Sequence, residues 1–417
     1  KDTTDDSITQ SIPIIVATKL ADYPTETNDW GTVTLKMNVP TVDKKITKTA
    51  TGTVATNGYY ADARIGDVVK YELSSVIPTY TGYDISNPPR VFKLIDTASK
   101  GLSVDENSVK SVTLKSGTTE VVLNKGTDYT VSSNQYNVAE TEASYKAEYK
   151  SGTVTTIDLE KYVNMADGSK SKTDGNILEG YTVVVEFEAT VNKDAVIASV
   201  GNPNSVELEY SRTPDNVSTK IPGPEVPRVY TYEFGILKTD MAGNAIKSTD
   251  ALKGAQFVIA RVNDGSAETF MAKDASSGAW SDLDATKPAV DATTGVFTTD
   301  ANGKIAMSGL PAGTYHVYEI KAPDGYTSIG LPDFTFTIGS TIDDGTKAAT
   351  VTYTKATNTD DRIAFDNTTA SQANVKNAKN LTELPLTGDL GIKVFITVGV
   401  LLMAAGAAFA LSARMRA

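Results

Sequence analysis

The feature that most constrains this chain is a repeated alternation of apolar and polar residues in short segments. Runs of β-branched and aromatic residues are separated by Gly, Asn, Asp and Pro along almost the whole sequence. Thr182 to Val191 alternates with the period of two that a β-strand requires, and so does Val229 to Leu237. Asn302-Gly303 and Asp324-Gly325 are turn signals between such runs. This spacing predicts an all-β protein built from tandem Ig-like β-sandwiches.

The C-terminus departs from this pattern. Ile392 to Leu411 is an apolar run of about 20 residues, the length that a helix needs to cross a membrane. Its one charged residue, Lys393, lies at the edge, where a long side chain can reach the membrane surface. Arg414 and Arg416 follow the run, as the positive-inside rule expects of a cytoplasmic end. We therefore expect a C-terminal transmembrane helix, with residues 1–383 outside.

Composition fits an extracellular protein and argues against several kinds of site. The 417 residues include no cysteine, and His316 is the only histidine, which leaves little material for thiolate or histidine chemistry. The formal net charge of −12 argues against nucleic acid as a partner, because phosphate binding needs a basic surface. Asp300 to Gly303 resembles part of a calcium loop, but the glutamate that should end the loop is missing, so a hairpin turn explains it better. We expect no metal and no cofactor.

A pentapeptide before the apolar run changes the interpretation of the C-terminus. Leu384-Pro385-Leu386-Thr387-Gly388 matches the LPxTG sorting signal of Gram-positive surface proteins, and the order of pentapeptide, apolar span and basic tail matches too. The resemblance implies that a sortase cleaves between Thr387 and Gly388, holds Thr387 as a thioester and passes it to an amine. The span then serves only until sorting. The alternative is a permanent membrane anchor.

Residues 1–38 look like the end of an incomplete N-terminal domain. Trp30 and the stretch Thr34-Leu35-Lys36-Met37-Asn38 resemble the end of the first domain of backbone pilins, where a short strand carries a Tyr-Pro-Lys-Asn motif. Lys36 is in place, whereas the Tyr and Pro are absent and the Asn is displaced by one position. The resemblance implies Lys36 as the intersubunit acceptor, with Lys45 a second lysine that we expect to point outward. Since the chain begins without an apolar segment, we expect a mature form or a fragment.

Residues 39–226 form the next predicted domain. Several motifs in the right order resemble the isopeptide-forming D2 domain of fimbrial subunits across nearly the whole segment. These motifs are Pro40 to Ile46, Ile65 to Tyr71, Phe92 to Thr97, Gly101-Leu102 and Asn202 to Ser211.

Residues 227–379 form a further predicted domain, after a stiff linker with Pro222, Pro224 and Pro227. The block from Tyr315 to Tyr326 carries a Tyr-x-x-x-Glu-x-x-Ala-Pro-x-Gly-Tyr pattern that is similar to the collagen-adhesin B-type (Cna-B) domain. Residues 380–417 complete the chain with a spacer, the sorting signal, the span and the basic tail.

Both resemblances imply an internal isopeptide bond between a lysine and an asparagine. Burial disfavours the charged form of an amine, so a buried lysine can attack an amide carbon as a neutral nucleophile. A buried carboxylic acid hydrogen-bonds the amide and shuttles protons, and ammonia leaves. No cofactor is needed, because the fold supplies proximity and orientation.

Strand phase and family pattern agree on three residues in segment 227–379. By the period of two, Lys238 continues the apolar row of Tyr232, Phe234 and Ile236. Glu319 likewise continues the row of Tyr315 and Val317, and Asn377 shares a face with Val375. The family pattern implies Lys238 as nucleophile, Glu319 as acid and Asn377 as electrophile. The alternative is a surface or half-buried salt bridge between Lys238 and Glu319.

The same reasoning applies to segment 39–226. Lys44 shares a face with Val42 and Ile46, Asp96 with Phe92 and Leu94, and Asn204 with Val206 and Leu208. The resemblance implies a bond from Lys44 to Asn204 with Asp96 as the acid. Asn202 lies on the same phase and is the rival electrophile. The alternative is a solvated lysine and an ordinary capping aspartate.

Together these resemblances identify the chain as a member of the sortase-assembled backbone (major) pilins of Gram-positive bacteria. They imply a structural, non-enzymatic subunit at the cell surface, covalently anchored in a pilus or the cell wall. The implied partners are sortase, neighbouring pilin subunits, peptidoglycan, and a host ligand or tip adhesin. Two alternatives stay open: a monomeric wall-anchored adhesin or stalk, and an enzyme that uses a pair of carboxylates.

Overall fold

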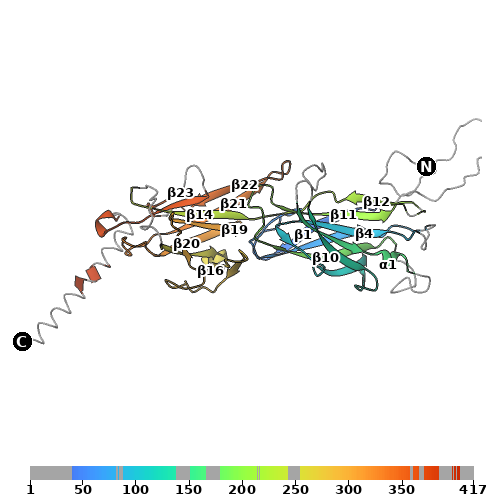
Figure 1. Cartoon of the computed structure of the whole chain (residues 1–417), viewed down its shortest axis with the longest axis horizontal. Coiled ribbons are helices and arrows are strands. Elements are labelled where there is room, and N and C mark those ends of the chain that lie inside the picture. The colour runs from blue at the N-terminus through green and yellow to red at the C-terminus, as the bar shows by residue number, and fades with distance from the viewer. Residues whose placement is uncertain are drawn as a thin grey trace, which may run out of the picture. The chain divides into compact units, whose positions relative to one another are not determined.

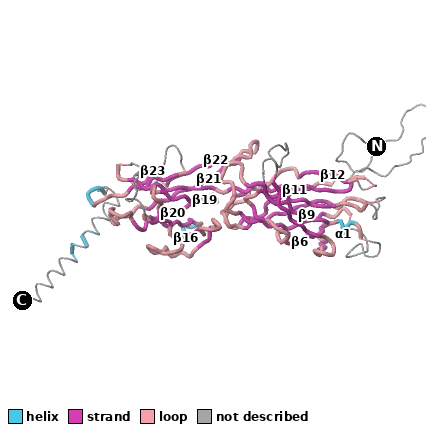
Figure 2. The backbone as a smooth tube through the Cα atoms, viewed as in Figure 1, coloured by secondary structure: helices cyan, strands magenta, loops and turns pink. Residues whose placement is uncertain are grey.

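The structure is a computed structural model of the chain. It describes residues 40–80, 83, 88–137, 151–165, 179–213, 215, 217–242, 254–356, 360–365 and 371–384, together with 397, 399–400 and 402–403. Strands make up most of this part of the chain, as Figures 1 and 2 show. The predicted all-β class with Ig-like domains is confirmed.

The chain divides into two compact units. Of the described residues, the first unit holds those from 40 to 63, from 67 to 196 and from 200 to 230, and the second holds 64–66, 197–199 and those from 231 onward.

Two sheets form the first unit. One sheet has the strand order β1-β3-β10-β6-β7, with β5 beside β10. Its strands are β1 (Val42–Thr49), β3 (Val68–Val76), β10 (Thr182–Val191), β6 (Val109–Ser116), β7 (Thr119–Val122) and β5 (Leu102–Ser103). The other sheet has the order β2-β13-β11-β4-β9-β8, with β12 beside β11. Its strands are β2 (Tyr60–Asp62), β13 (Arg228–Tyr230), β11 (Asn202–Ser211), β4 (Phe92–Ser99), β9 (Ser151–Asp158), β8 (Thr130–Asn137) and β12 (Ser218–Pro222), and the helix α1 (Glu160–Val163) follows β9.

The second unit is also built from two sheets. The smaller has the order β19-β14-β24-β23 and comprises β19 (Lys304–Leu310), β14 (Tyr232–Thr239), β24 (Gln372–Lys376) and β23 (Ile363–Phe365). The larger has the order β17-β16-β15-β20-β21-β22, with β18 beside β15. Its strands are β17 (Trp280–Asp282), β16 (Glu268–Lys273), β15 (Gln256–Val262), β20 (Gly313–Lys321), β21 (Asp333–Ile342), β22 (Ala349–Lys355) and β18 (Phe297–Thr298). Two 3₁₀ helices, η2 (Asp264–Ser266) and η3 (Leu381–Glu383), complete the unit.

The structure tests the strand predictions one by one. The strand predicted from Thr182 to Val191 is β10. The single strand predicted from Val229 to Leu237 is wrong, because the chain forms β13 and β14 with a break at Thr231. There the Thr231 carbonyl accepts the N–H of Ala198 instead of a neighbour in the sheet. Pro222 belongs to β12, not to an extended linker.

The Asp300 segment is a turn, as predicted. The Asp300 carboxylate accepts the backbone N–H groups of Asn302 and Lys304, each at 2.8 Å, and Gly303 has a φ of 73°. Among the described residues, no group of three or more His, Asp or Glu side chains is arranged to hold a metal ion.

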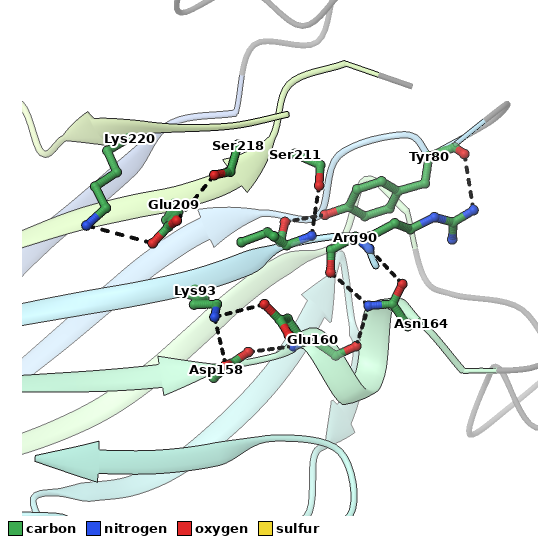
Figure 3. A network of polar contacts seen from close by, with 11 residues as sticks. Tyr80, Arg90, Lys93, Asp158, Glu160, Asn164, Glu209, Ser211, Ser218 and Lys220 are labelled. Carbon is green, nitrogen blue, oxygen red and sulfur yellow. Dashed lines mark hydrogen bonds and ion pairs between the residues drawn. The ribbon is translucent and has the colours of Figure 1, made fainter. Parts of the chain in front are cut away.

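A polar network around the buried Arg90 lies at the start of β4 in the first unit (Figure 3). The Arg90 guanidinium donates to the carbonyls of Tyr80, Tyr83 and Val163, and its centre lies 5.0 Å from the Tyr80 ring centroid. Asn164 accepts the Arg90 N–H at 2.9 Å and donates to the Arg90 carbonyl at 2.8 Å. Backbone that no strand pairs is satisfied in this way, since buried polar groups need partners.

Aromatic side chains fill the space between the two sheets of the second unit. Phe234 of β14 stacks on Phe336 of β21 with ring centroids 3.8 Å apart, and it also contacts Phe334 and Phe365. Phe234 is 1% exposed, so its ring belongs to the core.

We predict that Phe234→Ala lowers the free energy of unfolding of the second unit by about 3–5 kcal/mol, because it removes a buried ring and leaves a cavity. Val290→Ala is the control, since Val290 is 47% exposed and its loss should change stability by less than about 0.5 kcal/mol. Denaturant unfolding of both variants measures the difference. Equal effects would contradict the assigned core.

Candidate functional site

In the second unit, three different strands bring together the residues that the sequence singled out. Lys238 lies on β14, Glu319 on β20 of the opposing sheet, and Asn377 directly after β24. β14 and β24 are parallel neighbours in which Lys238 pairs with Val375, and the Asn377 N–H donates to the Thr239 carbonyl at 3.1 Å. The pairing therefore places Lys238 and Asn377 on neighbouring strands of one sheet.

The three side chains are in direct polar contact. Lys238 Nζ donates to Glu319 Oε2 at 2.9 Å and also contacts Asn377 Oδ1. Asn377 Nδ2 donates to Glu319 Oε1 at 2.9 Å. One carboxyl group therefore bridges the amine and the amide.

Burial sets the electrostatics of this set. The side chains of Lys238 and Glu319 are both 0% exposed. Burial lowers the pKa of Lys238, against the opposing charge and hydrogen bond of Glu319, and it raises the pKa of Glu319. Both shifts favour a neutral amine beside a neutral acid. A surface or half-buried salt bridge, the alternative drawn from the sequence, does not fit side chains that are fully buried.

The first unit holds a second set with a different layout. Lys44 lies on β1 of one sheet, and Asp96 and Asn204 lie on β4 and β11, which are neighbours in the other sheet. In the register Asp96 faces Val206 and Asn204 faces Ala98, so the two side chains are diagonal neighbours on the inner face. Lys44 approaches them from across the core.

The three side chains of the first unit make fewer polar contacts with one another than Lys238, Glu319 and Asn377 do. Lys44 Nζ contacts Asp96 Oδ2, and all three residues are 0% exposed. Asp96 Oδ1 and both amide atoms of Asn204 have no hydrogen-bond partner in the part of the chain that the structure describes. Burial lowers the pKa of Lys44 to about 8 and raises the pKa of Asp96. The pKa shifts thus have the same directions as those of Lys238 and Glu319 in the second unit.

Asn202, the rival on the same strand phase, is engaged elsewhere. Its Oδ1 accepts the Val196 N–H at 2.8 Å, and its Nδ2 donates to the carbonyls of Val196 and Val229, each at 3.1 Å. These backbone bonds use both ends of the amide. Of the two asparagines, only Asn204 has an amide without such bonds.

The aromatic walls of both sets were not recognised from the sequence. Lys44 Nζ lies 4.6 Å from the ring centroid of Tyr71 and 4.9 Å from that of Phe187, and Lys238 Nζ lies 5.5 Å from that of Phe257. Tyr71 lies within a motif used for the family resemblance, but nothing in the spacing of Tyr71 or of Phe257 ties either ring to a lysine. The alternating pattern of the sequence indicated that each lysine faces the core. Which rings the lysine contacts depends on how the strands are arranged in the fold.

Arg362 is a further neighbour that sequence reasoning missed. It is 2% exposed, forms an ion pair with Asp360 at 2.6 Å, and its charge acts on both Lys238 and Glu319. Its carbonyl accepts the Lys376 N–H at 3.0 Å, directly before Asn377. The hairpin that carries Arg362 thus holds the strand end that presents Asn377.

One of the predicted sorting residues, Leu384, is among the described residues. Leu384 is 3% exposed and packs with Ala378, Met241 and Ile329. Pro385, Leu386, Thr387 and Gly388 lie outside the described residues, as do Lys36 and the predicted N-terminal domain.

The predicted membrane span lies almost wholly outside the described residues too. Its five described residues, Thr397, Gly399, Val400, Leu402 and Met403, are helical. Among the residues that the structure describes, no helix is both long and apolar enough to span a membrane.

Comparison with known families covers both units and the tail. The model of a Gram-positive pilin backbone subunit 2, Cna-B-like domain, matches residues 65–214. That of a prealbumin-like fold domain, SpaA, matches residues 233–357, and the LPXTG cell wall anchor motif matches residues 376–416. The chain therefore carries the domain of a Gram-positive pilin backbone subunit, followed by a prealbumin-like domain and a cell wall anchor motif. Pilin backbone subunits are structural proteins, and the anchor motif implies sortase processing and covalent attachment at the cell surface.

Individual relatives in this family are distant. The "Trypsin-resistant surface T6 protein" of Streptococcus pyogenes serotype M6 is 24% identical over 425 residues, which cover 87% of this chain and 66% of that relative. The full-length RrgB pilus protein of Streptococcus pneumoniae has a TM-score of 0.49 at 16% identity, covering 84% of this chain and 74% of that one. A C-terminal fragment of the major pilin GBS80 of Streptococcus agalactiae has a TM-score of 0.44 at 22% identity, covering 72% of this chain and 91% of that fragment.

The single histidine of the chain lies apart from both lysine sets. His316 is held between two carboxylates, with Nδ1 2.7 Å from Glu268 and Nε2 3.3 Å from Asp333, and its ring stacks on Tyr318 at 3.9 Å. Burial lowers the pKa of His316, but the hydrogen bonds and charges of Asp333 and Glu268 outweigh it and raise the pKa.

We predict that His316 titrates above its ordinary pKa of 6.5. Because the folded pKa is raised, the stabilising contribution is fully present below the unfolded value and is lost as pH rises through the folded value. Proton NMR can follow the imidazole without assignment, since the chain has one histidine. Glu268→Gln should move the midpoint down. A midpoint at or below the ordinary value in the unchanged protein would contradict the assigned contacts.

Proposed function

We propose that this chain is a backbone subunit of a sortase-assembled pilus, in which an internal lysine–asparagine isopeptide bond closes each described unit. One observation carries the proposal. Two units of different topology each bury a lysine, a carboxylic acid and an asparagine of matching predicted roles. The matches to a pilin backbone domain and to a cell wall anchor motif support the structural role.

The proposed reaction uses only groups of the chain. The neutral amine of the lysine attacks the side-chain amide carbon of the asparagine, forming a C–N bond and a tetrahedral intermediate. The acid, Glu319 or Asp96, gives a proton to the leaving nitrogen and receives one from the attacking nitrogen. The old C–N bond breaks, ammonia leaves, and the acid returns to its starting state. Holding the reactants in contact replaces the catalyst that such a reaction needs in solution.

Each bond would close a long loop of the chain. Lys238 and Asn377 are 139 residues apart in sequence, and by analogy with a disulfide such a loop contributes about 5 kcal/mol of stability. In the second unit the bond joins neighbouring strands β14 and β24, and in the first it joins the two sheets through β1 and β11. A subunit locked in this way suits a fibre that carries load.

The tail supplies the intersubunit chemistry of the proposal. Sortase holds Thr387 as a thioester, and an amine of the next subunit, Lys36, resolves it. The same thioester passes to peptidoglycan at the base of the fibre. A host ligand or a tip adhesin completes the set of proposed partners, and the proposed domains are 39–226 and 227–379.

We predict that the intact mass of the folded chain lies two ammonia masses below that of its sequence. Lys44→Ala and Lys238→Ala should each restore one of them, after allowing for the substitution. Asn204→Ala should restore one as well, whereas its matched control Asn202→Ala should restore none. A wild-type mass equal to the sequence mass overturns the proposal.

The acids give a separate prediction, because Asp96→Ala and Glu319→Ala leave both bonding partners in place. Each variant should abolish the loss of ammonia from the unit that carries the substitution, while the other unit still loses its ammonia. Peptide mass spectrometry locates the remaining cross-link. Bond formation at an unchanged rate in either variant would remove that acid from the mechanism.

Polymerisation is predicted to proceed through Lys36. Incubation of the chain with its pilus sortase should yield a ladder of covalent polymers and a branched peptide joining Thr387 to Lys36. Lys36→Arg should abolish the ladder, while Lys45→Arg, whose side chain is 51% exposed, serves as the control. A ladder that survives Lys36→Arg assigns the acceptor to another lysine. If no lysine matters and only monomer reaches the wall, the chain is a monomeric wall-anchored adhesin or stalk.

A further inference from the structure

The set in the first unit contains a fourth polar group that the reaction above does not use. Tyr71 lies on β3, where it pairs with Ile46 of β1 and Phe187 of β10, and it points into the core. The residue is 2% exposed, and its ring centroid is 4.6 Å from Lys44 Nζ. The side chain therefore borders the reacting amine.

The Tyr71 hydroxyl and the Asn204 amide are two unsatisfied groups that border the same amine. Lys44 Nζ lies 4.6 Å from the Tyr71 ring centroid and contacts Asp96, whose diagonal neighbour on the adjacent strand is Asn204. Yet neither the hydroxyl nor either amide atom is in a well-formed hydrogen bond anywhere in the described part of the chain. Leaving a buried donor and a buried acceptor unpaired is unfavourable, so such groups mark a place where a bond forms in another state.

Comparison of the two sets shows what the first unit lacks. In the second unit, both oxygens of Glu319 are used, one by Lys238 and one by Asn377, each at 2.9 Å. In the first unit, the shorter Asp96 contacts Lys44 through Oδ2, and its Oδ1 has no partner among the described residues. The carboxyl group therefore does not hold the Asn204 amide as Glu319 holds that of Asn377.

We propose that the Tyr71 hydroxyl donates a hydrogen bond to the side-chain oxygen of Asn204 and stabilises the negative charge that develops there during attack by Lys44. The inference rests on the proposed function and adds a catalytic residue to the first unit only. When the new C–N bond forms, the carbonyl π electrons move to the side-chain oxygen of Asn204. When ammonia leaves, they return, and the Tyr71 proton stays on its own oxygen throughout.

The surroundings suit a donor that keeps its proton. Burial, and then the charge of Asp96, raise the pKa of Tyr71 well above its usual range, so the hydroxyl stays neutral. A fixed donor in a dry site acts more strongly on a developing oxyanion than it would in water. Tyr71 thus fits the role of a hydrogen-bond donor and not that of a base.

The test is Tyr71→Phe in the full chain, followed by intact mass after cell-free synthesis. The variant keeps the ring between Lys44 and Phe187 and removes only the hydroxyl. We expect the first unit to lose its ammonia about 10²–10³-fold more slowly, the effect of deleting one oxyanion donor. The second unit should lose its own at the wild-type rate and serves as an internal reference in the same molecule.

Tyr315→Phe is the matched control. It also removes a buried tyrosine hydroxyl, which donates to the Pro311 carbonyl at 2.7 Å and belongs to neither set. Both ammonia losses should proceed in this variant as in the wild type. A slow step in the first unit of Tyr71→Phe alone then belongs to the chemistry and not to the loss of a buried hydroxyl.

A measurement on the unaltered protein completes the test. In a high-resolution crystal structure of the cross-linked chain, the Tyr71 oxygen should lie about 2.5–3.0 Å from the carbonyl oxygen of the Lys44–Asn204 bond. A longer separation overturns the inference, even if Tyr71→Phe fails to fold. If the wild type forms the bond and Tyr71→Phe forms it at the same rate, the inference is overturned as well, while the proposed function stands. Absence of any ammonia loss in the wild type overturns both.

Discussion

The structure depends on placing an amine and a carboxylic acid in the apolar interior of each sandwich. Two buried charges without water are unfavourable, and their mutual attraction repays this only in part. Lys44 and Lys238 are fully buried, and burial pushes each amine and its acid toward their neutral forms. A neutral amine is a nucleophile and a neutral acid is a proton donor. The same desolvation that makes the pair unfavourable as ions therefore prepares it to react, and the proposed amide product carries no charge.

The two units meet this requirement with different geometry. In the second unit the amine and the amide lie on neighbouring parallel strands, and Glu319 reaches both from the opposing sheet. In the first unit the amine stands alone on β1, while Asp96 and Asn204 share the other sheet. The shorter Asp96 side chain and the different approach leave the Asn204 amide without a carboxyl contact among the described residues. A separate donor such as Tyr71 answers a need that the second unit does not have.

Some features of the site followed from sequence alone because strand period is a local property. Alternation of residues two apart put Lys44, Lys238 and Glu319 on apolar rows, and the structure buries all three. Phase could not separate Asn202 from Asn204, since both lie on one face of β11. The separation came from Val196 and Val229, whose backbone groups occupy the Asn202 amide. Those partners are remote from one another in sequence, so no local pattern carries them.

The sequence by itself determined the all-β class, the anchor motif and the family, because these depend on short-range patterns and contiguous motifs. It also determined which residues could face a core. Only the tertiary structure decided which strands are neighbours, which sheet each reacting group comes from, and which aromatic rings enclose the amines. The break at Thr231 shows the same limit, because its carbonyl is taken by Ala198, a residue outside the local alternation. Side-chain period is fixed by backbone geometry within one strand, whereas contacts across a core depend on the pairing of segments that lie far apart in the chain.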